Sequence, residues 1–302
     1  MNKTIAGIRT KRYGLSLKAT KYMQCYLMIA LPIIGFVVFI IYPYIWTAVK
    51  SWFYYTGNPA VTRFVGWNNF KDVAGDGVYW NSWLTSFKLT LYKLPIELPI
   101  SLVLALILNN LKGAGFFRTA FFLPSIISVA ILGIIVTNMF DYFGFVNAWL
   151  IKAGLITKEI DWFSSTFNAM TALTVGSIWN SFGTNVIYFT AALSNIPEEL
   201  YEAAYIDGAG KMRTFFKITL PLMSPVLQTI ILLAVNGTLQ CNDYILVTTA
   251  GAPGGTTNTV MAHITNSFLP GFAKGDVNIG YGCAMSLVTS ALMCCLTVFI
   301  IP

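Results

Sequence analysis

Six long apolar stretches constrain the fold of this chain more than any other feature of its sequence. Each is near or above the ~20 residues that a helix needs to cross a lipid bilayer. Hydrocarbon offers a polypeptide backbone no hydrogen-bond partners, so apolar segments of this length cross it as helices. The sequence therefore predicts an all-α membrane protein with six transmembrane helices. The stretches lie at about residues 23–50, 85–111, 116–140, 168–193, 220–247 and 280–301.

The composition agrees with a chain embedded in lipid. Of the 302 residues, 56% are hydrophobic and 10% are charged, whereas soluble domains carry about 25% charged residues. The net charge of +7 does not indicate a nucleic-acid partner, because the basic residues lie between the apolar stretches rather than in one cluster. We therefore predict a cytoplasmic N-terminal segment at 1–22 and one membrane domain at 23–302, surrounded by membrane lipid.

The positions of lysine and arginine predict the orientation in the membrane. Basic residues concentrate before the first apolar stretch, whereas the next loop has only Arg63 and Lys71, offset by two aspartates. Cytoplasmic segments carry the excess of basic residues, so we expect both termini inside the cell after six crossings. The loops 112–118 and 194–219 are then cytoplasmic, and the loops 51–84, 141–167 and 248–279 are external.

The second apolar stretch is the most polar of the six at its start. It carries Lys88, Lys93 and Glu97, and a charge at the centre of a membrane helix costs a few kcal/mol. The stretch still spans if both lysines extend their ammonium groups to the membrane interface. Neither Glu97 nor Asp243 has an obvious charged partner deep in the membrane.

The polar segment between the fourth and fifth stretches has the signals of two short helices. Pro197 suits a first helical position, and the glutamates that follow it complement the positive helix start. Gly208 and Gly210 end this helix and permit a sharp bend, after which a second short helix is expected at about 211–218, with Pro221 opening the fifth span. Such a projection in a cytoplasmic loop is typical of a docking site for a partner protein. The alternative is an amphipathic loop that lies on the lipid surface.

This segment resembles the "EAA" signature of integral-membrane subunits of bacterial ABC importers. The pattern E-A-A-x3-G-x9-I-x-L-P matches without a gap at Glu202-Ala203-Ala204, Gly208, Ile218 and Leu220-Pro221. Further motifs resemble the carbohydrate-importing, maltose-type branch: Ile196-Pro197, Glu199-Leu200-Tyr201, Ile206-Asp207-Gly208-Ala209, Gly66-Trp67-Asn68-Asn69-Phe70 and Phe117-Arg118-Thr119.

The resemblance implies a six-span type I ABC importer permease fold in the bacterial cytoplasmic (inner) membrane. It implies a heterodimer with a second homologous permease, two cytoplasmic ATPase subunits that each hold one coupling loop (about 194–219), and an external substrate-binding protein. The partner ATPases would bind ATP and Mg, and this chain would bind no cofactor itself. The implied ATPase-coupling residues are Glu202, Ala203, Ala204, Asp207, Gly208 and Gly210.

No catalytic, metal or nucleotide site is predicted within the chain. Gly208-Ala209-Gly210-Lys211 is similar to part of a phosphate-binding loop, but Tyr205 replaces the first required glycine and Met212 the required serine or threonine. The single histidine, His263, has no placed partner and is interpreted as structural. The five cysteines lie in or beside apolar stretches without metal-ligand spacing. We therefore predict that the chain is not an enzyme.

Polar residues inside the fourth and fifth stretches predict a substrate pathway. In the fourth, one helical face carries Ser177, Asn180, Thr184 and Tyr188. In the fifth, Asn236, Gln240 and Asp243 recur at i, i+4 and i+7. Polar groups at membrane depth face a bundle interior or a water-filled cavity, where they can bond an oligo- or polysaccharide. The alternative is that they only join helices to one another. The predicted pathway residues are Asn180, Thr184, Asn185, Tyr188, Asn236, Gln240, Asp243 and Tyr244.

Two further alternatives stay open at this point. Lys88 and Lys93 favour an acidic sugar if they lie near the external mouth, although interfacial anchoring explains them equally well. A stand-alone ion-driven carrier or channel is the competing function, and it predicts paired charges deep in the spans together with inverted internal repeats.

Overall fold

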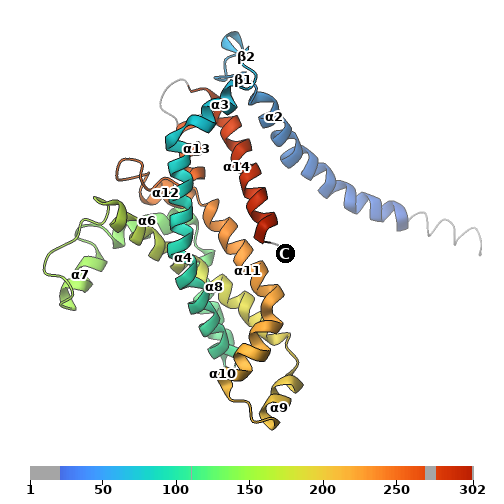
Figure 1. Cartoon of the computed structure of the whole chain (residues 1–302), viewed down its shortest axis with the longest axis vertical. Helices are drawn as coiled ribbons and strands as arrows, with labels where there is room; N and C mark the ends of the chain where they lie inside the picture. The colour runs from blue at the N-terminus through green and yellow to red at the C-terminus, as the bar shows by residue number, and fades with distance from the viewer. Residues whose placement is uncertain (1–20, 110, 269–276, 301–302) are drawn as a thin grey trace, which may run out of the picture.

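The computed structural model describes residues 21–109, 111–268 and 277–300 and is mostly helical. Figure 1 shows a long helical body from which the N-terminal helix projects at one side. The major helices are α2 (Tyr42–Lys50), α4 (Gly77–Asn109), α5 (Ala114–Ile126), α6 (Val129–Met139), α8 (Thr166–Ser194), α11 (Leu220–Leu239) and α14 (Ile279–Ile300). The shorter ones are α3 (Asn68–Gly75), α7 (Phe145–Lys152), α9 (Glu198–Ile206), α10 (Lys211–Thr214), α12 (Asp243–Thr248) and α13 (Val260–Phe268).

Four helical segments of the described chain are long and apolar enough to cross a membrane: Lys21–Lys50, Gly77–Asn109, Lys211–Leu239 and Ile279–Ile300. The pair α5 and α6 adds a fifth if it is counted as one broken span. Helix α8 is also long, at 29 residues, but it is too polar for this set. Where the structure describes them, all six predicted stretches are thus mainly helical, and the predicted all-α membrane fold is confirmed.

Two of the predicted spans are interrupted, which corrects the sequence-based boundaries. The third turns by 92° between α5 and α6, where Ile127 and Ser128 adopt extended backbone angles after Pro124. The fifth ends at Leu239, and after a short break the chain continues as α12. Periodicity cannot reveal such breaks when the residues on both sides are apolar.

Helix α8 lies at the centre of the body and packs against α4, α5, α6 and α11. The approach to α5 is close, because a Cβ atom at Gly183 would overlap the backbone carbonyl of Phe121. Ser101 of α4 donates a hydrogen bond of 3.1 Å to the carbonyl of Phe182 on the other side of α8. Buried Phe189 and Val186 continue this core toward α11.

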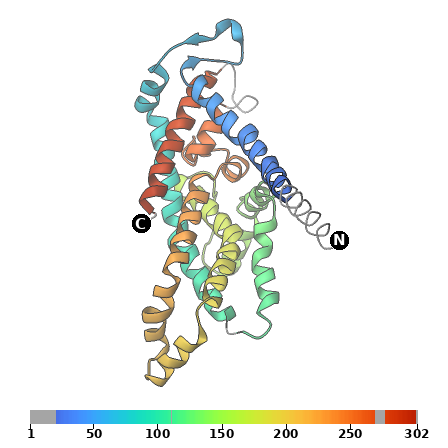
Figure 2. The same cartoon turned by 90° about the vertical axis from the view of Figure 1, so that its right-hand side faces the viewer.

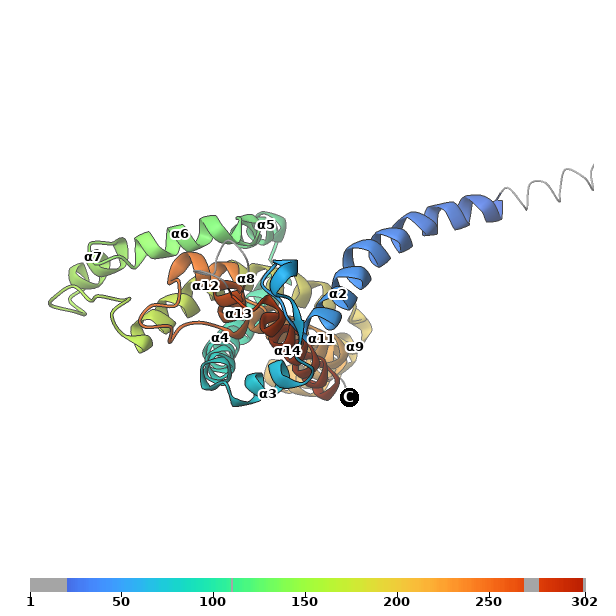
Figure 3. The ribbon, with the colours of Figure 1, turned by 90° about the horizontal axis from the view of Figure 1, so that it is seen from above.

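The N-terminal helix Lys21–Lys50 stands apart from the rest of the bundle. The most apolar 18 residues of this helix are 0% buried. The helix includes the π-helical turn η1 (Val37–Ile41). Only its end, α2, packs against α14. Seen from above in Figure 3, this helix extends to one side of the body, and α6 and α7 extend to the other.

One end of the body is capped by short elements between the first two spans. Strands β1 (Phe53–Tyr54) and β2 (Arg63–Phe64) pair antiparallel around the 3-10 turn η2 (Pro59–Val61). Asp76 then caps α4, accepting bonds of 2.8 and 3.1 Å from the N–H groups of Val78 and Tyr79. Burial alone would raise the pKa of Asp76, but bonds from the Tyr281 hydroxyl and these N–H groups outweigh it and hold the pKa below its usual value.

Candidate functional site

A cavity of about 480 Å³ lies where α4, the α5–α6 bend, α8 and the α11–α12 break meet. Ligand sites in proteins commonly occupy roughly 300–1,000 Å³. Seven of the eight predicted pathway residues line it: Asn180, Thr184, Asn185, Tyr188, Gln240, Asp243 and Tyr244. The helix breaks themselves form part of its wall, so irregular backbone at this depth faces a cavity rather than lipid.

Asn236 is the predicted pathway residue that the structure does not bring to this cavity. Its side-chain amide donates to the carbonyl of Leu232 at 3.1 Å and to Thr297 Oγ1 of α14 at 3.4 Å. Here the alternative interpretation applies, because the amide joins α11 to α14. The spacing of four residues to Gln240 did not put the two side chains on one surface, since α11 ends between them at Leu239.

The cavity wall holds a buried ion pair that the sequence did not predict. Lys93 Nζ lies 3.6 Å from Glu97 Oε2, and the side chains are 8% and 1% exposed. Glu97 Oε1 also accepts a hydrogen bond of 2.7 Å from Asn185 Nδ2 of α8. The predicted extension of Lys93 to the membrane interface is therefore wrong, because its partner lies one helical turn further along α4. Lys88, in contrast, is exposed.

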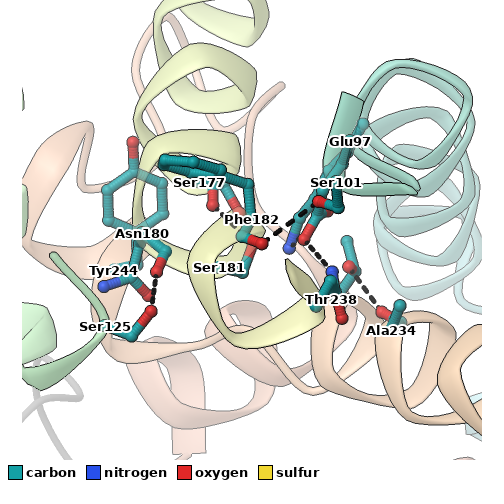
Figure 4. Close-up of polar contacts among 12 residues, drawn as sticks. Glu97, Ser101, Ser125, Ser177, Asn180, Ser181, Phe182, Ala234, Thr238 and Tyr244 are labelled. Carbon is teal, nitrogen blue, oxygen red and sulfur yellow. Dashed lines mark hydrogen bonds and ion pairs between the residues drawn. The ribbon is translucent and has the colours of Figure 1, made fainter. Parts of the chain in front are cut away.

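Asn180 stabilises the bend between α5 and α6. Figure 4 shows Ser125 of α5 pointing to Asn180 of α8. Asn180 Nδ2 donates to the carbonyl of Pro124 at 2.9 Å, and Ser125 Oγ donates to the carbonyl of Asn180 at 2.5 Å. The Pro124 carbonyl at the end of α5 also accepts from the N–H of Ile127 at 3.3 Å, so Asn180 is its second donor. Asn180 thus has a structural partner as well as a place in the cavity wall.

Gln240 and Asp243 lie at the α11–α12 break and are both exposed. Asp243 accepts a bond of 3.2 Å from Asn242 Nδ2, whereas the Gln240 side chain has no hydrogen-bond partner among the described residues. Tyr244 differs, since it is 2% exposed and its hydroxyl donates to the carbonyl of Leu173 at 3.1 Å. Gln240 therefore offers the cavity an amide that is not engaged elsewhere in the described part of the chain.

Sequence reasoning missed several lining residues, mainly small or apolar ones. Ser125, Gly237, Thr238 and Asn242 line the cavity with the predicted residues. Asn242 had a detectable signal, because it adjoins Asp243 in a polar interruption of the fifth stretch. The others look like ordinary span residues, and only the tertiary fold brings them to the wall.

The predicted coupling loop forms the end of the body opposite the β1–β2 hairpin, as Figures 1 and 2 show. Helix α9 ends in a Schellman arrangement, in which the N–H of Gly208 bonds the carbonyl of Tyr205 at 3.1 Å and the N–H of Ala209 bonds that of Ala204 at 2.9 Å. Gly208 has φ +70°, a conformation that glycine adopts without strain. Glu202, Ala203, Asp207 and Gly210 are exposed, whereas Ala204 is buried.

The second predicted helix of this segment is not a separate unit. Helix α10 continues through the π-helical turn η3 (Phe215–Thr219) into α11, so Lys211–Leu239 is one continuous helix. Pro221 therefore does not open the span, and the π-helical turn just before it accommodates the hydrogen bond that a proline cannot donate. Tyr201 and Thr219 share a hydrogen bond of 3.2 Å, which ties α9 to this long helix.

The sequence model of a family described as "Binding-protein-dependent transport system inner membrane component" matches residues 97–301. The match covers more than half of the chain and includes the coupling loop and every residue that lines the cavity except Lys93. The chain belongs to this family. As a member, it is a non-catalytic, multi-pass subunit of an inner-membrane transport system, which agrees with the predicted lack of enzymatic activity.

Relatives support the same family assignment. The chain is 33% identical to the lactose transport system permease protein LacF of Rhizobium radiobacter, over 85% of this chain and 88% of that protein. It is 32% identical to the trehalose/maltose transport system permease protein MalF of Thermococcus litoralis, over 78% of both chains. The predicted membership in the carbohydrate-importing branch is thereby confirmed.

A solved structure supports the fold. The crystal structure of a bacterial ABC transporter involved in the import of the acidic polysaccharide alginate matches with a TM-score of 0.79, covering 95% of this chain and 96% of that chain. The two are 20% identical in sequence, so the likeness concerns the fold alone. The predicted ABC importer permease fold is confirmed.

Proposed function

We propose that this chain is one of two permease subunits of an ATP-driven importer that moves an oligo- or polysaccharide into the cytoplasm. The observation that carries the proposal is a combination of two features of the same body. One is the polar cavity at the helix breaks, and the other is the exposed coupling loop with its EAA signature at one end. ATP and Mg belong to two separate ATPase subunits, and an external binding protein delivers the sugar.

The coupling loop has the surface that a docking ATPase needs. The side chain of Glu202 is exposed beside exposed Ala203, so a partner can approach the helix closely and meet a carboxylate. Tyr205 and Ile206 are 81% and 83% exposed, and apolar side chains of this size at a polar loop favour a protein contact. We propose that one ATPase cleft holds α9, with the hydrogen bond between Tyr201 and Thr219 transmitting its motion to α11.

The N-terminal helix supports a second membrane subunit. The most apolar 18 residues of this helix are 0% buried. The helix is rich in exposed large apolar side chains such as Leu31, Phe39 and Ile45. We propose that this helix packs against the second permease within the membrane. We also propose that the second permease is a different polypeptide from this one. The N-terminus and the EAA loop then lie in the cytoplasm, as the distribution of basic residues predicts.

A purification experiment separates this proposal from a carrier that works alone. The deep Lys93–Glu97 pair is a feature that such a carrier would also have, so the partners decide between the two. We expect affinity purification of the tagged chain from native membranes to recover an ATPase and a second permease. Sugar transport by the purified lone chain in liposomes, without ATP, would refute the importer.

The cavity yields a second prediction, in which two lining amides behave differently. Gln240→Ala should lower sugar uptake by the complete importer about tenfold at subsaturating sugar while leaving its thermal stability unchanged, because Gln240 has no bond to lose. Asn180→Ala should lower stability by about 1 kcal/mol, because the Pro124 carbonyl loses its side-chain donor. Uptake and thermal unfolding of the purified complex measure both effects. Equal stability losses in the two variants would contradict the assignment of Gln240 to the sugar.

A further inference from the structure

We propose that the cavity is selective for uncharged sugars, with Glu97 as the residue that neutralises Lys93 and so keeps this lysine from attracting an acidic sugar. The inference rests on the proposed sugar-import function and names the substrate class of the same cavity. It replaces the acidic sugar that the two lysines of the second stretch suggested.

The position of the pair is the first step. Both residues line the cavity, and both come from the same face of α4, one helical turn apart. Lys93 Nζ is 3.6 Å from Glu97 Oε2, and Asn185 holds the other carboxylate oxygen at 2.7 Å. An ammonium that has a carboxylate at this distance is already neutralised, so it has little attraction left for a second carboxylate.

The sum of charges around the cavity is the second step. Its lining contains one lysine, Lys93, and two carboxylates, Glu97 and Asp243. The formal sum is therefore one negative charge. In a wall of low dielectric, such a charge repels an anion more strongly than it would in water. A uronate or sugar phosphate would enter this cavity against repulsion, whereas an uncharged sugar would not.

The third step is an acceptor with no hydrogen-bond partner. Glu97 Oε2 is fully buried and accepts no hydrogen bond from the described residues, since Lys93 at 3.6 Å is beyond hydrogen-bond length. Buried polar atoms normally have partners, and an exception in a native protein asks for an explanation. The explanation in this cavity is electrostatic, because the oxygen faces the Lys93 ammonium at 3.6 Å and neutralises it without accepting a hydrogen bond.

The experiment measures the charge that the cavity presents, independently of ATP and of sugar identity. In the complete importer, the five native cysteines of this chain are replaced by serine, and Ser181→Cys in the cavity wall provides a single reporter. The rate of labelling by the cationic trimethylammonioethyl methanethiosulfonate is divided by the rate for the anionic sulfonatoethyl reagent. A cysteine at exposed Ser164, which is outside the cavity lining, serves as the matched control.

We expect Glu97→Gln to lower this cation-to-anion ratio at position 181 by roughly threefold or more, and Lys93→Gln to raise it by a similar factor. The double variant Lys93→Gln/Glu97→Gln should retain the wild-type ratio. The net charge of the two side chains is zero both in the wild type and in this variant. The ratio at position 164 should not change. If Glu97→Gln fails to assemble, the Lys93 and double variants give the same comparison.

The proposal is overturned if the wild-type cavity labels faster with the anionic reagent, relative to the position 164 control, or if neither single variant changes the ratio. Protection of the wild-type reporter by trigalacturonate but not by maltotriose would also overturn it and indicate an acidic sugar. A failure of the proposed import function would appear in the purification experiment instead, since the labelling ratio requires neither an active ATPase nor a second permease of known identity.

Discussion

Substituting arginine for Glu202 should stop ATP-driven sugar uptake while the protein still reaches the membrane. The side chain of Glu202 is exposed on α9, so reversing its charge disturbs no internal contact. In the proposed importer this carboxylate meets a basic residue of the ATPase. Like charges placed opposite each other at an interface cost several kcal/mol, so uptake and substrate-stimulated ATP hydrolysis in proteoliposomes should each fall more than about tenfold.

The neighbouring Glu198 provides the matched control for this substitution. It is also exposed and lies in the first turn of the same helix, but it is outside the EAA signature. Glu198→Arg changes the charge by the same amount and even opposes the helix dipole, yet we expect it to retain most of the uptake. If both variants transport and hydrolyse ATP normally, Glu202 does not contact the ATPase.

The bend that follows α9 allows an independent test of the same coupling. Gly208 has φ +70°, and its N–H donates to Tyr205, so Gly208→Pro removes the bond and forces φ to about −65°. We expect this variant to insert and to lose uptake. Gly208→Asn is its control, because asparagine tolerates this conformation and no atom lies within 4 Å of the added Cβ.

The second large effect concerns the contact between α5 and α8. Gly183→Ala should destabilise the protein strongly, because the added methyl group would overlap the backbone carbonyl of Phe121. Backbone cannot give way as a flexible side chain does, so the two helices must separate. Overpacking of this kind costs about 1–3 kcal/mol or more, and the cavity behind the helices would change shape with it. We expect a lower yield of folded complex and an unfolding transition several degrees lower.

Gly237→Ala is the control for Gly183→Ala. It makes the same glycine-to-alanine change inside a helix, but at a position without a close neighbour. Gly237 lies in α11, and no atom is within 4 Å of the place that an alanine methyl group would occupy. Replacing glycine by alanine inside a helix otherwise stabilises it by roughly 0.5–1 kcal/mol. Thermal unfolding of the two purified variants should therefore change in opposite directions. Equal behaviour would mean that α5 and α8 are not in close contact.

Much of the fold followed from local properties of the sequence. The long apolar stretches predicted the six helical segments, since each satisfies its backbone bonds internally whatever its neighbours are. The coupling loop was predictable for a similar reason, because the EAA residues and Gly208 act through the conformation of a few adjacent residues. Its second helix was misjudged, since the helix continues through η3 and past Pro221 without a break.

The polar faces of the fourth and fifth stretches indicated seven of the residues that line the cavity. The bend after Pro124 and the break after Leu239, which make the space, leave no mark in apolar periodicity. Lys93 and Glu97 were visible as charges, and their spacing of four allowed a contact. Whether they anchored in the interface or paired in the interior depended on the depth of α4 beside α8.

Contiguous residues alone were enough to predict a helical membrane protein with an EAA loop of the importer type, because helix formation in lipid and the EAA pattern are both local properties. The packing of the helices was needed to show that Asn236 joins two helices, that Asn180 supports a bend and that Lys93 is neutralised. Those outcomes depend on which groups meet across helices, and the energy of a buried charge or amide is set by its partners in space.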